Sequence, residues 1–221
     1  YKRFEKFLFF SENQYRSFNK GYPTKRGFYI NMPLKSFGAI TKTTHKVGCR
    51  KFLFFGFIQD YKRLDLFIHA AKQIGNAQFV IAGACNEWEK YEKIIGQMDN
   101  LQCNIHFLKN DEIILYFQEA DYLVLPYDES TQSGPLLIAY NYNIPVIASD
   151  IELFKTMVCD KQNGFLFEKG NLSSLIKILD DANNLPESQY QLLVKNMSKR
   201  KEQYQSTTNF KLALDTFLGK R

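Results

Sequence analysis

The chain of 221 residues is 45% hydrophobic and 24% charged, a composition typical of a globular protein with one sizeable core, or one core and part of another. No apolar run reaches membrane-spanning length and no signal peptide is visible, which argues against a membrane-spanning or exported protein. The four cysteines lack C-x-x-C spacing, so free thiols are expected rather than a zinc site or a disulfide framework.

The net charge of +6 is unevenly spread, because residues 1–50 carry +9 and the remainder carries −3. Such a basic segment is typical of contact with nucleic acid, acidic lipid head groups or a phosphorylated substrate, or of a solvated face. It lacks a recognised platform of aromatic and basic residues, so nucleic acid is not expected as a partner. A further interpretation is that the protein is cytoplasmic and makes peripheral contact with the inner face of the membrane.

Residues 1–50 begin with a short set of elements. The pattern predicts a strand over residues 6–11, whose apolar run at 7–10 indicates burial, then a helix over 12–20 and a strand over 27–31. A stretch rich in Gly, Thr and Lys follows from residue 33 to about residue 48, and is typical of a linker.

From residue 51 onward, short apolar strands alternate with helices of about ten residues. Strands are predicted over residues 51–56, 78–83, 104–108, 122–125, 145–148 and 164–167. Helices are predicted over residues 64–74, 87–98, 111–120, 133–143, 152–158, 172–182, 187–203 and 209–218. This alternation favours an α/β fold with a Rossmann-like, doubly wound parallel sheet, whose strands are apolar throughout because helices cover both faces.

Ligands of an open parallel sheet bind beyond the carboxyl ends of its strands, and the most informative segment there is the polar loop 126–134. Ser133 and Gly134 stand where the next helix begins, and free N–H groups and the helix dipole favour phosphate at such a start. An N-cap serine followed by glycine also starts helices without any ligand. Asp128 and Glu129 suit sugar hydroxyls or act as turn formers, and both interpretations stay open.

Lys62 follows the first strand of the alternation and precedes a helix, where it can reach a diphosphate as a point charge. An exposed lysine at a helix start is also common. No G-x-G-x-x-G or Walker A pattern occurs, which argues against a nicotinamide dinucleotide or P-loop site. No Ser/His/Asp or Cys/His set has a convincing spacing, so catalytic residues are not predicted.

Six segments follow one another in order along the chain: FFGFIQDYKRLD (54–65), FVIAG (79–83), ADYLVLPY (120–127), TQSGPLLIAY (131–140), IPVIAS (144–149) and NGFLF (163–167). Together they resemble the retaining glycosyltransferases of the GT-B fold, family 4 (group 1), over about residues 33–180. The resemblance implies the C-terminal half of a GT-B fold. Residues 1–34 would be a remnant of the acceptor domain with a linker, 35–205 the donor-binding domain, and 206–221 a helix crossing back.

The resemblance also implies a metal-independent, retaining hexosyltransferase with no cofactor, whose substrate is a UDP- or GDP-sugar. The acceptor would be a saccharide or a lipid-linked group of a bacterial surface polysaccharide or glycolipid. This chain would supply the donor-binding part and be inactive by itself. The alternative is a non-catalytic module that binds a nucleotide sugar or another phosphorylated ligand.

The family pattern places the donor diphosphate at Lys62, Arg63, Ser133 and Gly134. It places the sugar and nucleotide at Gly56, Phe57, Gln59, Gly83, Lys109, Asn110, Glu129, Thr131 and Gln132. The sequence also departs from the pattern. Phe57 stands where arginine is frequent and Arg63 where glycine is common, and the usual pair of glutamates falls on Thr131 and Ala139. These departures leave the donor sugar open.

Overall fold

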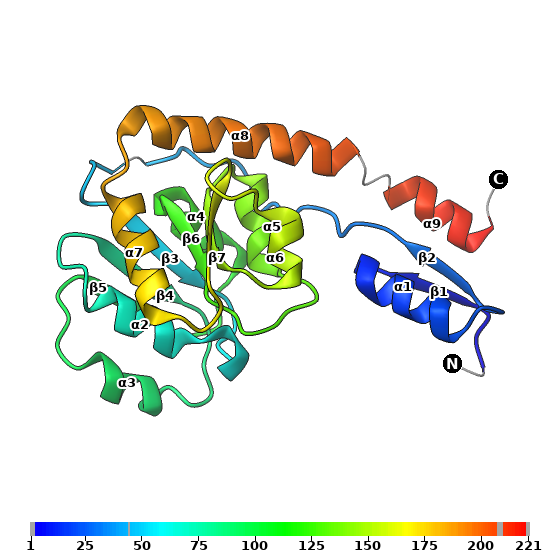
Figure 1. Cartoon of the computed structure of the whole chain (residues 1–221), viewed down its shortest axis with the longest axis horizontal. Helices are drawn as coiled ribbons and strands as arrows, with labels where there is room; N and C mark the ends of the chain where they lie inside the picture. The colour runs from blue at the N-terminus through cyan, green and yellow to red at the C-terminus, as the bar shows by residue number, and fades with distance from the viewer. Residues whose placement is uncertain (1–2, 44, 207–209, 220–221) are drawn as a thin grey trace. The chain divides into compact units, whose positions relative to one another are not determined.

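The computed structural model describes residues 3–43, 45–206 and 210–219 (Figure 1). The chain divides into two compact units. Residues 35–199 form the larger unit, and residues 1–34 together with 200–221 form the smaller one. The long helix α8 (Glu187–Ser206) begins in the larger unit and ends in the smaller one.

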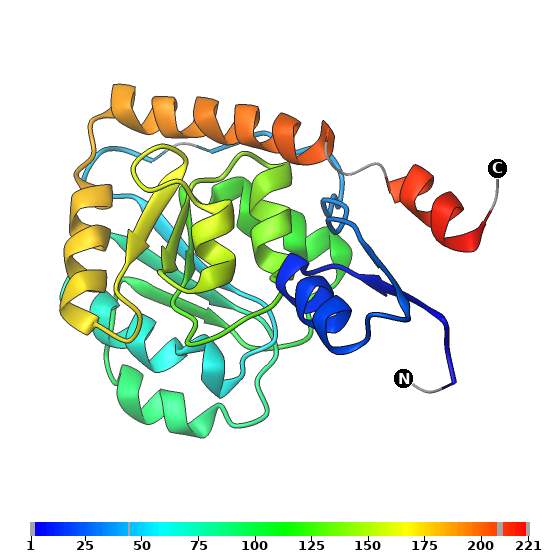
Figure 2. The same ribbon diagram turned by 45° about the vertical axis from the view of Figure 1, so that its right-hand side comes forward.

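Within the described residues, the larger unit holds a six-stranded sheet of parallel strands in the order β5-β4-β3-β6-β7-β8 (Figure 2). The strands are β3 (Lys51–Phe55), β4 (Gln78–Ala82), β5 (Leu101–Asn104), β6 (Tyr122–Leu125), β7 (Val146–Ser149) and β8 (Gly164–Phe167). The chain adds β4 and β5 on one side of β3 and then returns to add the others on the opposite side. The doubly wound, Rossmann-like sheet predicted from the alternation is therefore confirmed.

Helices cover both faces of this sheet. On one face, α2 (Leu64–Ala71) contacts both α3 (Glu89–Ile95) and α7 (Leu172–Asn183). On the other face, α4 (Asn110–Glu119) contacts β3, and α5 (Gly134–Asn141) contacts β6. A short helix, α6 (Glu152–Met157), connects β7 to β8. The core under α2 is aromatic, and its fully buried rings include those of Phe52, Phe67, Phe79 and Tyr122.

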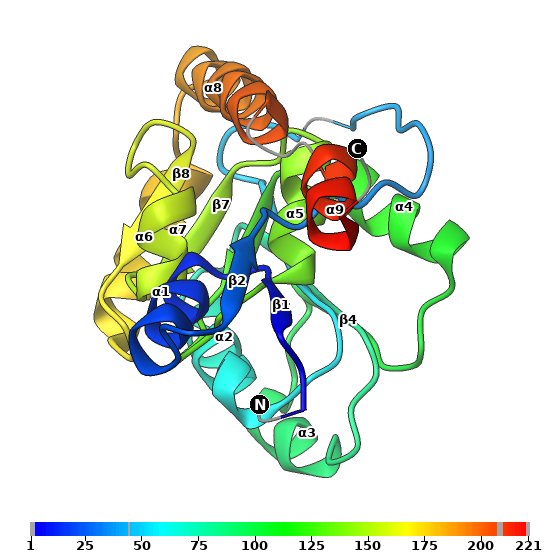
Figure 3. The ribbon, with the colours of Figure 1, turned by 90° about the vertical axis from the view of Figure 1, so that its right-hand side faces the viewer.

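In the smaller unit, β1 (Lys6–Phe9) and β2 (Arg26–Tyr29) pair in parallel, with α1 (Glu12–Gly21) between them in sequence (Figure 3). The strand predicted over residues 6–11 therefore exists, but its side chains are half-buried rather than buried as its apolar run indicated. The helix α9 (Phe210–Leu218) contacts β2, and Lys6 Nζ donates a hydrogen bond to the Phe217 carbonyl at 3.0 Å.

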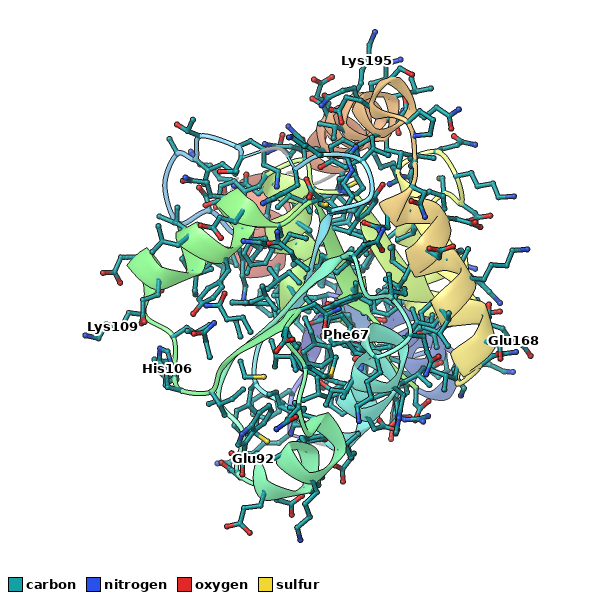
Figure 4. All side chains as sticks on the ribbon, turned by 90° about the vertical axis from the view of Figure 1, so that its left-hand side faces the viewer. Phe67, Glu92, His106, Lys109, Glu168 and Lys195 are labelled. Atoms are coloured by element: carbon teal, nitrogen blue, oxygen red, sulfur yellow. The ribbon has the colours of Figure 1, made fainter. Side chains whose placement is uncertain are left out.

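The third strand of the sheet was wrongly predicted. It lies at Leu101–Asn104 rather than at residues 104–108, and α3 is shorter than the predicted 87–98. β5 is an edge strand with exposed side chains, so it lacks the apolar run that marks the other strands. The apolar residues that follow it belong to a loop, in which Phe107 is 84% exposed. His106 therefore lies in this loop (Figure 4). Its Nε2 is 2.9 Å from Glu112 Oε1.

A buried polar cluster closes the amino ends of β3 and β6. Arg50 is fully buried, donates through Nη2 to Glu187 Oε2 at 2.6 Å, and lies with Cζ 4.2 Å from the ring centroid of Tyr190. Asp121 is also fully buried and accepts a hydrogen bond from the Lys51 N–H at 2.8 Å. These contacts join the first strand of the sheet to the start of α8.

Candidate functional site

The turns that follow β3 and β4 lie side by side. The Gly56 N–H donates to the Ala82 carbonyl at 2.9 Å, and the Ile58 N–H donates to the Ala84 carbonyl at 2.8 Å. Gly83 has a φ of +144°, and a Cβ there would stand 2.2 Å from the Gly56 carbonyl oxygen. Gly56 has a φ of +106°. Gly56 therefore favours glycine because of its backbone conformation, and Gly83 requires it because of both its conformation and the close approach.

Lys62 is a buried cation beside these turns. It ends the 3-10 helix η1 (Asp60–Lys62) and is 7% exposed. Its Nζ lies 3.5 Å from the point where a Cβ on Gly56 would stand, and Pro135 Cγ lies 3.5 Å from the same point. Nζ has no hydrogen-bond acceptor and no carboxylate partner among the described residues, and burial lowers the pKa of Lys62 to about 8. A buried ammonium without a counter-charge is costly, so this position favours an anion from solution.

The start of α5 lies beside Gly56 and Lys62. Ser133 is the N-cap, and its hydroxyl accepts a hydrogen bond from the Leu136 N–H at 3.3 Å. Pro135 has no N–H. In the part of the chain that the structure describes, the Gly134 N–H has no partner. The helix start therefore offers one backbone donor and the positive end of the dipole to a phosphate.

Tyr127 lies beneath this site and was not predicted from the sequence. Lys62 Nζ lies 5.6 Å from its ring centroid, and its hydroxyl is buried without a hydrogen-bond partner among the described residues. Burial raises the pKa of Tyr127, and the nearby Ser133 hydroxyl opposes only a small part of that rise. A tyrosine at the end of an apolar strand resembles any other core residue in the sequence, so no signal identified it.

Arg63 connects the η1 turn to the loop that precedes α5. Its Nη1 donates to Asp128 Oδ1 at 3.2 Å, its Nε donates to Asp65 Oδ1 at 3.0 Å, and the Asp128 N–H donates to the Tyr61 carbonyl at 2.8 Å. Arg63 has a φ of +52°, which explains why glycine is common at this position in the family that the sequence resembles. Because its guanidinium is held by two carboxylates, its expected contact with a diphosphate stays a prediction.

A hollow of about 580 Å³ adjoins this turn. Its lining includes Tyr61, Arg63, Asp128, Glu129 and Lys169. These side chains offer hydroxyl, carboxylate and ammonium groups, the chemistry that sugar hydroxyls require. Lys62 and Ser133 do not line it, so the phosphate-binding chemistry and this polar hollow lie next to each other rather than in one cavity.

The remaining candidates are exposed. Phe57 is 46% exposed, and Gln59, Thr131 and Gln132 are also exposed side chains on the loops after β3 and β6. Lys109 is the N-cap of α4, and it extends outward from the ribbon (Figure 4). Lys109 and Asn110 follow β5 at a greater distance than predicted, because that strand ends at Asn104. Their contact with a nucleotide stays a prediction.

Lys35 also lies at the start of α5, and no pattern in the sequence marks it as a site residue. Its Nζ lies 3.3 Å from the point where a Cβ on Gly134 would stand. It belongs to the stretch predicted as a linker, where one exposed lysine resembles another, so only the folded arrangement brings it to the site.

Comparisons with known proteins agree with this arrangement. The model of the family described as glycosyl transferases group 1 matches residues 49–182, more than half of the chain. An uncharacterized glycosyltransferase of Haemophilus influenzae is 25% identical over 155 residues, which are 66% of this chain and 43% of that protein. The alpha-monoglucosyldiacylglycerol synthase of Acholeplasma laidlawii is 27% identical over 126 residues, which are 56% of this chain and 31% of that protein.

Among solved structures, a mutant of TarM from S. aureus is 18% identical with a TM-score of 0.78, over 99% of this chain and 44% of that one. This likeness shows the GT-B fold. The chain spans less than half the length of the curated relatives that it matches. The family match over residues 49–182 covers the sheet together with the turns that hold Lys62 and Gly134. The chain belongs to the group 1 glycosyl transferases.

Proposed function

We propose that this chain is the donor-binding part of a retaining, metal-independent enzyme that transfers a hexose from a UDP- or GDP-sugar. The observation that carries the proposal is the position of Lys62. Its side chain is buried, and its ammonium has no counter-charge among the described residues and lies at the start of α5 beside Gly56. A diphosphate supplies the missing negative charge, and the free Gly134 N–H supplies a donor for it.

The same arrangement suits the chemistry of the leaving group. Negative charge develops on the diphosphate as the bond to the sugar breaks, and a fixed ammonium and a helix N-terminus stabilise that charge without reorganising. Glu129 and Asp128, at the neighbouring hollow, are the groups that we assign to the sugar hydroxyls. The groups that would act on the acceptor are not assigned to residues of this chain.

The names of similar proteins support the substrate class. The Acholeplasma relative is named for a glycolipid product, and the TarM mutant was solved with UDP and alpha-GlcNAc-glycerol. We extend this to a saccharide or lipid-linked acceptor in the synthesis of a surface polysaccharide or glycolipid, in the cytoplasm.

Calorimetric titration of the chain with UDP, GDP and ADP tests donor binding. We expect at least one of them to bind, with an affinity that EDTA leaves unchanged. Failure of all of them to bind would contradict the proposal. Turnover is tested separately, with a protein that also carries an acceptor domain, by measuring release of the nucleoside diphosphate and the anomeric configuration of the product.

A second candidate is a module that binds a nucleotide sugar without catalysis. The usual glutamate pair is replaced by Thr131 and Ala139, so neither position holds a carboxylate. Thr131 is exposed, and Ala139 is fully buried within α5. This candidate predicts donor binding with no hydrolysis and no transfer. Any measurable transfer by the protein with its acceptor domain would reject it.

We further propose peripheral contact with an anionic membrane through the smaller unit. Residues 1–34 and 200–221 hold twelve Lys and Arg against four Asp and Glu, a net charge of +8, whereas the larger unit carries −2. Within residues 3–43, 45–206 and 210–219, no helix is long and apolar enough to cross a membrane. Co-sedimentation with phosphatidylglycerol vesicles, but not with phosphatidylcholine vesicles, is expected. Failure to sediment with the phosphatidylglycerol vesicles would contradict this contact.

A further inference from the structure

We propose that Lys35 is a second cation of the diphosphate site, beside Gly134 at the start of α5. The inference rests on the proposed function and deepens it by assigning a binding residue that lies outside the matched residues 49–182. The inference rests on the position of Lys35 Nζ, which lies 3.3 Å from the point where a Cβ on Gly134 would stand.

The segment that carries Lys35 is fixed against α5. The Phe37 N–H donates to the Tyr142 hydroxyl at 2.8 Å, and that hydroxyl donates to the Gly38 carbonyl at 3.1 Å. Tyr142 is the C-cap of α5. The segment is therefore tied to the carboxyl end of the helix, while the Lys35 ammonium lies at its amino end.

The diphosphate needs more positive charge than the site otherwise offers. Each phosphate of a nucleoside diphosphate carries about one to two negative charges at neutral pH, and a helix N-terminus supplies only about half of a positive charge. The first turn of α5 also offers few backbone donors, because Pro135 has no N–H and the Leu136 N–H is held by Ser133. Lys62 by itself leaves part of the charge unpaired, and a second ammonium balances it.

Two other cations near the site are already paired with carboxylates of the chain. Arg63 is paired with Asp65 and Asp128, and Lys90 is paired with Asp60 and Glu87. By contrast, Lys35 has neither an ion pair nor a hydrogen bond from its ammonium to any described residue. Lys62 provides the independent sign of a ligand, since it is more than nine-tenths buried and also lacks a partner among those residues. The two lysines reach neighbouring glycines from different elements: Lys62, in η1, lies beside Gly56, and Lys35, in the segment before β3, lies beside Gly134. Pro135, the residue after Gly134, also lies 3.5 Å from the point where a Cβ on Gly56 would stand, which brings the two turns together.

The test is a titration of the chain and its variants with UDP, GDP, ADP and inorganic pyrophosphate, which carries the diphosphate without a base. Lys35→Ala is expected to weaken binding of pyrophosphate and of the preferred nucleotide about tenfold, since a charge-assisted hydrogen bond is lost. Lys35→Arg keeps the charge and is expected to keep most of the affinity. Lys46→Ala removes an exposed lysine from the same segment, near the amino ends of the strands, and is expected to change nothing.

The outcomes separate the two proposals. If the unchanged chain binds none of the four probes, the proposed function fails. If it binds and Lys35→Ala binds equally well, the donor site stands and the role of Lys35 is rejected. If Lys35→Ala and Lys46→Ala weaken binding equally, the effect comes from net charge and the role of Lys35 is again rejected. Unchanged melting temperatures of the variants show that the fold is intact.

Discussion

The ammonium of Lys62 lies over the ring of Tyr127, 5.6 Å from its centroid, and both side chains are buried. An aromatic face attracts a cation by about 0.5–2 kcal/mol, with the larger values at desolvated sites. That attraction offsets only part of the cost of burying the charge, as the lowered pKa of Lys62 shows. The site is therefore built at some expense to the stability of the unliganded protein.

Replacement of this cation should stabilise the fold and abolish its ligand binding. Lys62→Met keeps the apolar stem and removes the buried charge, so we expect an increase of about 1–3 kcal/mol in the free energy of unfolding without ligand. Binding of UDP or pyrophosphate should be lost. Urea denaturation and calorimetry measure the two effects, with Lys72→Met, at an exposed lysine, as the control. A loss of stability in Lys62→Met would show that the ammonium is already compensated.

Binding should also depend on pH in a defined direction. Burial lowers the pKa of Lys62 to about 8, so above that pH the neutral lysine must take up a proton from solution in order to pair with the ligand. We expect the affinity for UDP to fall between about pH 8 and about pH 9.5, by up to about tenfold per pH unit. Lys62→Arg stays charged throughout and should give a flat profile. Parallel profiles for the two proteins would contradict the assignment.

Gly83 should tolerate no side chain. Gly83→Ala places a Cβ 2.2 Å from the Gly56 carbonyl oxygen, at a φ of +144°, so β3 and β4 must separate at their carboxyl ends. We expect a loss of about 2–4 kcal/mol in the free energy of unfolding. Gly75→Ala, where nothing lies within 4 Å of the added Cβ, should change the stability by less than about 1 kcal/mol. Similar losses in the two variants would contradict the close approach of the turns.

Arg63 should show an unusual order of substitutions. Arg63→Gly loses the ion pairs with Asp65 and Asp128 but relieves the strain of a φ of +52°. Arg63→Ala loses the same pairs and keeps the strain. We expect the glycine variant to be the more stable of the two by about 1 kcal/mol, the reverse of the usual effect of glycine. Chemical denaturation of both variants measures the difference, and a more stable alanine variant would refute the strained conformation.

The sequence predicted the parts of the fold that depend on local patterns. Apolar strands such as β3 and β6 are continuous runs, so their positions follow from composition, whereas β5 is an edge strand whose exposed side chains conceal it. The helix start at Ser133 was predictable because an N-cap residue and a glycine follow a polar loop. The burial of Lys62 was not, because the η1 turn that folds it inward has no marked pattern. Lys35 is far from Gly134 in sequence, and only tertiary structure joins them.

The ion pair between the buried Arg50 and the half-exposed Glu187 joins residues 137 positions apart in the chain. Contacts of such sequence separation form late in folding, because closing a long loop costs entropy before the contact returns any energy. During synthesis, the first strand of the sheet leaves the ribosome long before the carboxylate that its arginine requires. The larger unit therefore gains its full stability only when α8 arrives. A product truncated before Glu187 would keep Asp121, 3.9 Å from Arg50, but would lose the acceptor of the Arg50 Nη2 hydrogen bond and be a substrate for proteolysis.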